Sequence, residues 1–182
     1  MCTLKAAQID IEISKIGQLY GASRSLFVAR QIRQFKGLSV IVTHDMADAE
    51  QLEKEIRFFR DGELNLLHFP DLETLPYDHF SPHQDIISER LRCLANLPSV
   101  TGRSVLLLSI STLLQRVSPT DYIAGRSLLI EVGQRLDMSG FKNRLIEQVY
   151  QAVSQVEQHG EFSVRGSIID LFPMGSRQPY RI

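Results

Sequence analysis

The sequence has little cysteine, almost no net charge and no long hydrophobic run, and each absence excludes a class of protein. Its two cysteines, Cys2 and Cys93, form neither a closely spaced zinc-binding pattern nor a disulfide framework, which is typical of a reducing, cytoplasmic protein. A formal net charge of -1 gives the chain no overall attraction to nucleic acid or to an anionic membrane. No apolar run approaches the roughly 20 residues that cross a bilayer, and the N-terminus lacks the layout of a signal peptide. We therefore expect a cytoplasmic protein without a membrane partner.

What is present is enough apolar material for a folded core. Hydrophobic residues make up 43% of the 182 positions, which excludes a disordered chain and allows one or two domains. The charge is unevenly placed. Residues 13–44 contain no acid and five cations, whereas in residues 45–63 acids outnumber bases. The five cations are Lys15, Arg24, Arg30, Arg33 and Lys36.

The first two thirds of the chain alternate between helical and strand patterns. We expect strands over 38–43, 64–69 and 104–109. Around them we expect a helix over 26–35, a helix from a capping Asp45 to Gly62 and a short helix over 112–117. A further helix is expected from a capping Ser81, with Pro82 at its first position, to about Leu97. Such alternation predicts a parallel sheet with helices on both faces. Residues 1–125 are therefore expected to form one α/β domain.

After Gly125 the pattern changes. We expect a strand over 128–132, a helix over 139–148, two strands within 161–172 separated at Gly166, and the start of another strand at 180–182. A helix followed by antiparallel strands indicates a smaller α+β domain over residues 126–182. A domain that ended at residue 182 would be cut within its sheet, so we expect a fragment of a longer protein.

Several long motifs resemble one family of repair proteins. They are Leu75-Pro-Tyr-Asp78, Phe80-Ser-Pro-His-Gln-Asp-Ile-Ile-Ser-Glu-Arg-Leu91, His159-Gly-Glu-Phe-Ser-Val-Arg-Gly166, Ile168-Ile-Asp-Leu-Phe-Pro-Met-Gly-Ser176 and Pro179-Tyr-Arg-Ile182. In these stretches the sequence resembles the N-terminal, UvrB-like region of the bacterial transcription-repair coupling factors (Mfd), and the Phe-x-Val-Arg-Gly and Asp-Leu-Phe-Pro patterns also resemble UvrB. The similarity runs from about residue 21 to residue 182.

The resemblance implies a fold and a set of partners. It implies a degenerate P-loop NTPase-like domain over 1–125, followed over 126–182 by a domain that recruits the repair protein UvrA. It also implies a larger parent, an ATP-dependent DNA translocase that contacts RNA polymerase and DNA through other parts. In the family, a C-terminal domain of the same protein masks the UvrA-binding surface. This segment itself is expected to carry no catalytic residue, cofactor or metal.

The loop before the first helix departs from a working phosphate-binding loop. In the UvrB pattern G-x-x-x-x-G-K-[ST], glycines let backbone N–H groups surround the phosphates, and the Lys and the hydroxyl bind phosphate and Mg²⁺. Here Gln18 replaces the first glycine, Ser23 the second and Arg24 the lysine, while Gly21 lies between them and Ser25 keeps the last position. Side chains at the glycine positions obstruct the backbone's approach to phosphate. We expect an ordinary helix start without ATP hydrolysis.

Arg165 and Arg181 are the candidate UvrA-binding residues, because family arginines at these motif positions contact acidic groups on UvrA. Strand alternation places Phe162 and Val164 on one face and Ser163 and Arg165 on the other. Gly166 allows a tight bend that aims Arg165 outward. UvrB commonly has a further arginine where this chain has Ser163. The alternative is that the arginines form ordinary surface ion pairs, which contribute little.

Two other functions remain open from the sequence. A residual anion site at the helix start would make the chain a nucleotide-binding module. The cations between residues 24 and 36 could instead contact DNA phosphates, although no exposed aromatic residues are interleaved with them.

Overall fold

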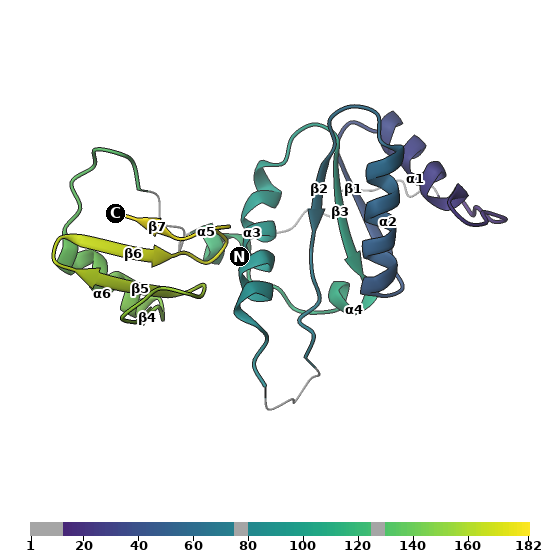
Figure 1. Cartoon of the computed structure of the whole chain (residues 1–182). Helices are drawn as coiled ribbons and strands as arrows, with labels where there is room; N and C mark the ends of the chain where they lie inside the picture. Colours follow the sequence, from purple (N-terminus) through teal and green to yellow (C-terminus); the bar gives the residue numbers. More distant parts are fainter. Residues whose placement is uncertain (1–12, 75–79, 125–129) are drawn as a thin grey trace, which may run out of the picture.

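The computed structural model of the chain describes residues 13–74, 80–124 and 130–182. Figure 1 shows two sheet-containing units side by side, with helix α3 between the two sheets. The first unit is a parallel sheet with flanking helices, and the second is a mixed sheet packed on a helix. The α/β class expected from the sequence is therefore confirmed. The domain boundary expected after residue 125 lies outside the described residues.

The first sheet is built from three parallel strands. They are β1 (Leu38–Thr43), β2 (Asn65–His68) and β3 (Ser104–Ser109), in the order β1-β3-β2. The register pairs Val40 with Leu106 and Leu67 with Leu106, so β3 is hydrogen-bonded on both sides. A central parallel strand is enclosed on both faces, which explains why β3 is an unbroken apolar run rather than an alternating one.

Helices cover both faces of this sheet. On one face α1 (Ser23–Gln34) and α2 (Met46–Phe59) pack against β3, with Ile32, Ile56 and Val105 in the core. On the other face α3 (Gln84–Asn96), followed by a 3-10 turn at Leu97–Ser99, packs Cys93 against Leu108. None of the described helices has the length and apolar character needed to cross a bilayer.

Helix starts show where local sequence signals held. Asp45 caps α2 as expected, because its carboxylate accepts a hydrogen bond from the Asp48 N–H at 2.8 Å. The expected Ser81 cap of α3 is wrong. His83 has an extended backbone and its Nδ1 accepts from the Asp85 N–H at 3.3 Å. The helix therefore starts at Gln84, and Pro82 lies before the helix.

The segment after β3 also differs from expectation. Helix α4 covers Ile110–Leu113 rather than 112–117, because Ser109 already caps it by accepting from the Thr112 N–H. A further short helix, α5 (Thr120–Ala124), was not predicted. The strand expected over 128–132 is wrong for its described part: the Gln134 N–H donates to the Glu131 carbonyl at 3.1 Å. That hydrogen bond closes a turn instead of a strand. Residues 128 and 129 lie outside the described ranges.

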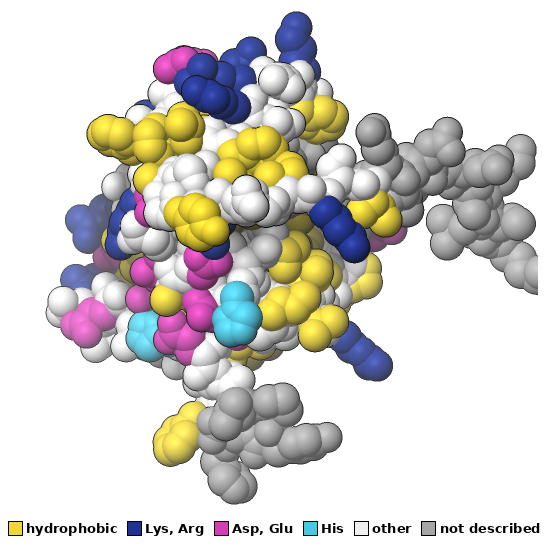
Figure 2. Space-filling view, turned by 90° about the vertical axis from the view of Figure 1, so that its right-hand side faces the viewer, with side chains coloured by type: hydrophobic (Ala, Val, Ile, Leu, Met, Phe, Trp, Pro, Cys, Tyr) yellow, Lys and Arg dark blue, Asp and Glu magenta, His cyan; other side chains and the backbone are white. Residues whose placement is uncertain are grey.

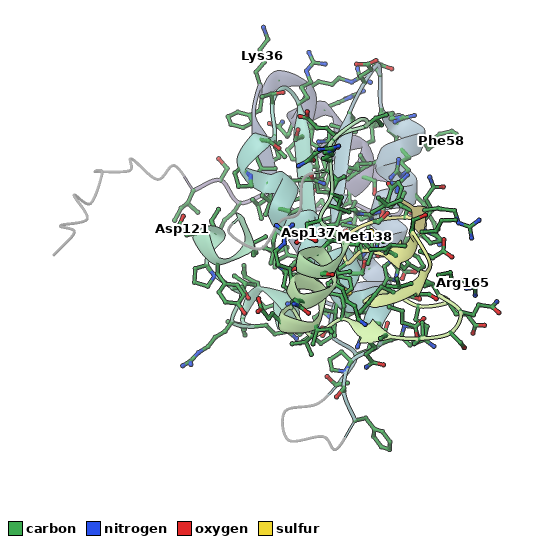
Figure 3. The ribbon with its side chains drawn as sticks, turned by 90° about the vertical axis from the view of Figure 1, so that its left-hand side faces the viewer. Lys36, Phe58, Asp121, Asp137, Met138 and Arg165 are labelled. Carbon is green, nitrogen blue, oxygen red and sulfur yellow. The ribbon has the colours of Figure 1, made fainter. Side chains whose placement is uncertain are left out.

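The second unit is a four-stranded sheet on one helix. Helix α6 (Met138–Glu147) is capped by Asp137, which lies beside Met138 at its start (Figure 3). The strands are β4 (Gln151–Ala152), β5 (Glu161–Arg165), β6 (Ile168–Phe172) and β7 (Tyr180–Arg181), in sequential order. The expected antiparallel pairing of β5 with β6 is confirmed, and β7 adds the expected third strand. The parallel edge strand β4 was not predicted.

The core of this unit lies between α6 and one face of the sheet. Phe141 and Leu145 of α6 contact Phe162, Ile169 and Leu171 of the strands, and all five are buried. The opposite face of the sheet is therefore left to other contacts.

The two units touch through α3 and the segment after β6. The Gly175 N–H donates to the Ser88 hydroxyl at 2.8 Å, and Gly175 has a φ of +83°. His159 places Nδ1 2.8 Å from the Asp85 carboxylate and Nε2 3.0 Å from the Ser176 carbonyl. The two ring nitrogens of His159 thus join α3 to the segment after β6.

Two carboxylates accept hydrogen bonds that join separate segments of the first unit. Asp71, which follows β2, accepts hydrogen bonds from Ser111 at 2.5 Å and Gln115 at 3.0 Å. Burial alone would raise the pKa of Asp71, but these hydrogen bonds outweigh it and hold the pKa below its ordinary value. In α2, burial is likewise outweighed at Glu53, whose pKa is lowered by hydrogen bonds from Arg57 and His68.

We predict that acid destabilises the fold through these groups. Their pKa values are lower in the folded chain than in the unfolded chain. Their contribution is therefore present above the unfolded values near pH 4 and is lost as pH falls through the folded values. The urea concentration at the unfolding midpoint should decrease as the pH is lowered from 7 to 3. In Asp71→Asn that fall should be smaller; an equal fall in both proteins would contradict the assignment.

The cap of α6 gives a second stability prediction. The Asp137 carboxylate accepts from the N–H groups of Ser139 and Gly140 at 3.2 and 3.1 Å. Asp137→Ala should lower the free energy of unfolding by about 1 kcal/mol, measured by urea denaturation. Asp137→Asn is the matched control, because its single amide oxygen still accepts one of the two bonds, so its stability should lie between those of the wild type and the Ala variant. Equal stability of the Ala and Asn variants would refute a capping role.

Candidate functional site

The open face of the second sheet carries both candidate arginines. Directly opposite residues in antiparallel strands share a face, and the register pairs Ser163 with Asp170 and Asp170 with Arg181. Arg165 is two residues from Ser163 and therefore lies on the same face. Because the buried residues Phe162, Ile169 and Leu171 occupy the opposite face, Arg165 and Arg181 both point away from the core.

Arg181 is held by a carboxylate of the neighbouring strand. Its Nε donates to Asp170 Oδ1 at 2.6 Å and its Nη2 to Asp170 Oδ2 at 3.0 Å. The side chain of Arg181 is 68% exposed, while that of Asp170 is 19% exposed. Hydrogen bonds from Arg181 lower the pKa of Asp170, and the charges of Arg181 and Arg165 add to this effect. Asp170 is therefore ionised at neutral pH.

Arg165 is held by the backbone of the segment after β4. Its Nη2 donates to the Ser154 carbonyl at 2.6 Å, and its side chain is exposed. Figure 3 shows Arg165 at the periphery of the molecule. Gly166, with a φ of +63°, and Ser167 form the tight turn between β5 and β6. The bend expected at Gly166 is thus present, and it places Arg165 at the end of its strand.

Burial along β5 departs from the simple alternation expected from the sequence. Ser163 shares a face with Arg165 but is only 4% exposed, whereas Val164, which shares a face with the buried Phe162, is 40% exposed. The Ser163 hydroxyl donates to the same Ser154 carbonyl at 3.2 Å. The segment after the unpredicted strand β4 therefore covers Ser163 and leaves Arg165 exposed.

Within the described part of the chain, which begins at residue 13, no strand precedes the degenerate loop. Residues 13–20 are irregular, Gln18 and Gly21 have φ values of +61° and +56°, and α1 starts at Ser23. The Ser23 hydroxyl donates to the Tyr20 carbonyl at 2.6 Å. The hydroxyl is thus used within the loop.

The two loop positions that would bind phosphate and Mg²⁺ are paired with α2. Arg24 forms a two-point ion pair with Asp48, with N–O distances of 2.5 and 3.2 Å. Hydrogen bonds to Asp48 raise the pKa of Arg24. Ser25 is fully buried and its hydroxyl donates a hydrogen bond to Glu55. That bond is the largest of the causes that lower the pKa of Glu55. These contacts attach the start of α1 to α2.

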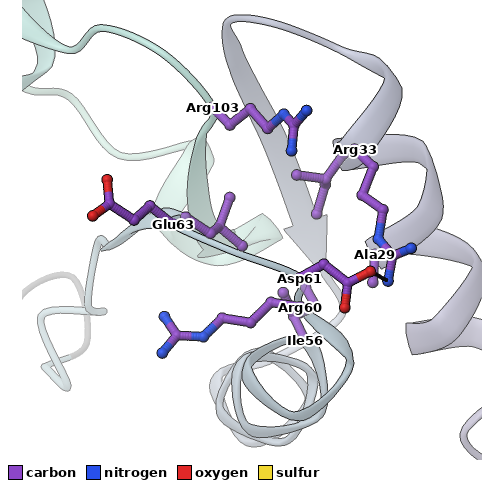
Figure 4. A pocket seen from close by; sticks show the side chains of 9 residues that line it. Ala29, Arg33, Ile56, Arg60, Asp61, Glu63 and Arg103 are labelled. Atoms are coloured by element: carbon purple, nitrogen blue, oxygen red, sulfur yellow. Dashed lines mark ion pairs between the residues drawn. The ribbon is translucent and has the colours of Figure 1, made fainter.

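The expectation that no exposed aromatic residue lies among the cations of the basic helix is wrong, because Phe35, between Arg33 and Lys36, is 55% exposed. The helix is nevertheless partly neutralised. In addition to the Arg24 pair, Arg33 pairs with Asp61 at 2.6 Å at the other end of α1 (Figure 4). The cavity drawn there has a volume of about 10 Å³, room for a single water at most. Figure 2 shows the side of the molecule on which α1 lies, where Lys and Arg side chains are scattered among acidic and hydrophobic ones.

Two further features were not identified from the sequence. A crevice of about 400 Å³ lies between the units, lined by Asp85, Ser88, Glu89, Arg92, His159, Ser176 and Arg177. The second feature is His159, the first residue of the motif over residues 159–166, whose link to α3 only the tertiary contact reveals.

Within the described ranges, no cluster of three or more His, Cys, Asp or Glu residues could hold a metal ion.

Comparison with known proteins agrees with the motifs. The UvrB interaction domain family matches residues 128–182. The transcription-repair-coupling factor of Escherichia coli (strain K12) is 43% identical over 167 residues, which make up 92% of this chain and 14% of that protein. The same-named protein of Haemophilus influenzae is 41% identical over equal shares, and that of Myxococcus xanthus is 33% identical over 90% of this chain.

The chain thus spans about one seventh of the length of the relatives it matches, 14% in the first two cases. The chain therefore belongs to the transcription-repair-coupling factor family, and its residues 128–182 carry that family's UvrB interaction domain.

Proposed function

We propose that this chain recruits the repair protein UvrA through the open face of the second sheet. The observation that carries the proposal is the placement of Arg165 and Arg181 on one exposed face, opposite the core. The family of the domain supports a role in assembling the repair machinery. The interaction would take place in the cytoplasm.

The chemistry of the two side chains favours an acidic partner surface. Arg181 uses Nε and Nη2 for Asp170, and Arg165 uses Nη2 for Ser154. Among the described residues nothing accepts from the remaining guanidinium nitrogens of either arginine, so they are available to a partner. Planar guanidinium groups bind carboxylates at two points and are enriched at interface hot spots.

For the parent protein we propose the wider role that the motif resemblance implies. A transcription-repair-coupling factor would bring UvrA to stalled RNA polymerase, and its other parts would contact polymerase and translocate on DNA with ATP. A C-terminal domain of the same parent would compete for the arginine face until the factor is engaged. We propose these activities for the parent protein, not for this segment.

We propose further that the segment uses no nucleotide or metal cofactor. The cation at Arg24 and the hydroxyl of Ser25 are committed to Asp48 and Glu55. A triphosphate would have to break both contacts and also approach a backbone obstructed at Gln18 and Ser23. DNA contact through α1 has less support, because Arg24 and Arg33 are already paired with acids.

Charge reversal tests the docking face. Arg165→Glu and Arg181→Glu should each weaken binding to purified UvrA by about thirtyfold, measured by biolayer interferometry with the 182-residue chain. The control is Lys142→Glu on α6, which lies across the core from this face and should bind as the wild type does. Wild-type affinity in the double arginine variant would refute the proposal.

A nucleotide titration tests the loop. A fluorescent ATP analogue with Mg²⁺ should show no saturable binding at micromolar concentration, because the phosphate-binding groups are paired within the protein. Saturable binding that Arg24→Ala abolishes would instead make the chain a nucleotide-binding module.

A further inference from the structure

Asp170 is an unexpected residue to find in the middle of a face that would meet acidic groups. It lies opposite Arg181 in the register, and Arg165 lies on the same face two positions from its other cross-strand partner, Ser163. A carboxylate here reduces the positive charge of the face and by itself should weaken attraction to an acidic partner. The geometry of its contact with Arg181 decides whether it masks the site or organises it.

The contact uses one particular edge of the Arg181 guanidinium. Asp170 accepts from Nε and Nη2, which form the side edge of the planar group. The end edge, which presents parallel N–H groups from Nη1 and Nη2, keeps its donors, since a guanidinium has five. A partner carboxylate can therefore bind end-on while Asp170 remains bound side-on. Masking would have required Asp170 to occupy the edge that the partner uses.

The contact with Asp170 restrains a side chain that is otherwise largely exposed to solvent. A side chain that is 68% exposed would otherwise sample many rotamers, and binding would have to immobilise it. Asp170 is itself only 19% exposed and lies within a paired strand, so it is a fixed anchor. The ion pair thus orders Arg181 before any partner arrives.

We propose that Asp170 is a positioning residue of the docking face, which holds Arg181 by its side edge and presents the end edge to a partner carboxylate. This inference rests on the proposed recruitment of UvrA. Asp170 itself makes no contact with the partner in this arrangement. The Ser154 carbonyl holds Arg165 in a comparable way, through a single hydrogen bond.

The first test needs no partner. In the free 182-residue chain, the Nε–H proton of Arg181 should exchange slowly with solvent, as measured by NMR. The Arg181→Ala variant assigns the signal, because the Arg181 Nε–H peak is missing from its spectrum. Asp170→Ala should abolish this protection, because it removes both acceptor oxygens. Asp170→Asn should only reduce it, because its single amide oxygen can accept one of the two bonds. Protection that survives in Asp170→Ala, or is absent in the wild type, overturns the proposal.

The second test measures UvrA binding. Asp170→Asn should weaken it roughly three- to tenfold, mainly through faster dissociation, although the variant is more positive. Glu147→Gln on α6 makes the same charge change across the core and should have no effect. Asp170→Glu, which keeps the carboxylate, should retain more affinity than Asp170→Asn, and thermal unfolding confirms that each variant is folded. Unchanged or tighter binding by Asp170→Asn shows masking or no role, and overturns the proposal.

A double-mutant cycle separates positioning from a direct contact. In an Arg181→Ala background Asp170→Asn should cause no further loss, because its effect passes through Arg181. Additive losses would mean that Asp170 acts independently, and would also overturn the proposal.

If the arginine reversals leave UvrA binding intact, the proposed function fails, whereas the NMR result still decides whether Asp170 orders Arg181. If the reversals weaken binding and Asp170→Asn does not, only this inference fails.

Discussion

The pairing register of β5, β6 and β7 determines which chemistry the second unit presents to its surroundings. Because side chains alternate along a strand, a slip of one residue would turn Arg165, Asp170 and Arg181 toward α6 and expose the apolar set. The core prevents this slip, since Phe162 and Ile169 are fully buried against the helix. The polar face is thus fixed by apolar packing on the other side of the sheet. The turn at Gly166 and the hydrogen bonds to Ser154 complete its geometry.

The first unit uses for packing the two loop positions at which the UvrB pattern would bind phosphate and Mg²⁺. The positions that would bind phosphate and Mg²⁺ hold Arg24 and Ser25, and both now contact α2. These contacts fasten α1 to α2 over the sheet, next to a core that includes Ile32 and Ile56. Residue types that resemble remnants of a catalytic loop therefore serve the fold.

The contact between the units links these two parts. The Gly175 N–H and His159 reach Ser88 and Asp85 on α3, and the His159 ring also lies against Phe172 with ring centres 4.0 Å apart. Phe172 ends β6, the strand that carries Asp170. The direction in which the arginine face points relative to the first unit therefore depends on a few polar contacts at α3, where both units supply hydrogen-bonding groups.

By itself the sequence determined the α/β class, the strands over 38–43 and 104–109, the Asp45 cap and the β5–β6 hairpin, because each depends on local periodicity, turn chemistry or motif. It also singled out Arg165 and Arg181, through motif resemblance. Only the tertiary structure decided that His83 rather than Ser81 caps α3, that β4 joins the second sheet, and that Ser163 is covered while Val164 is exposed. The same holds for the pairing of Arg181 with Asp170 and for the bridge from His159 to α3. The His83 cap is a local contact with Asp85, two residues away. The other features join different segments of the chain, and their partners are selected by strand register and helix packing, which local patterns do not encode.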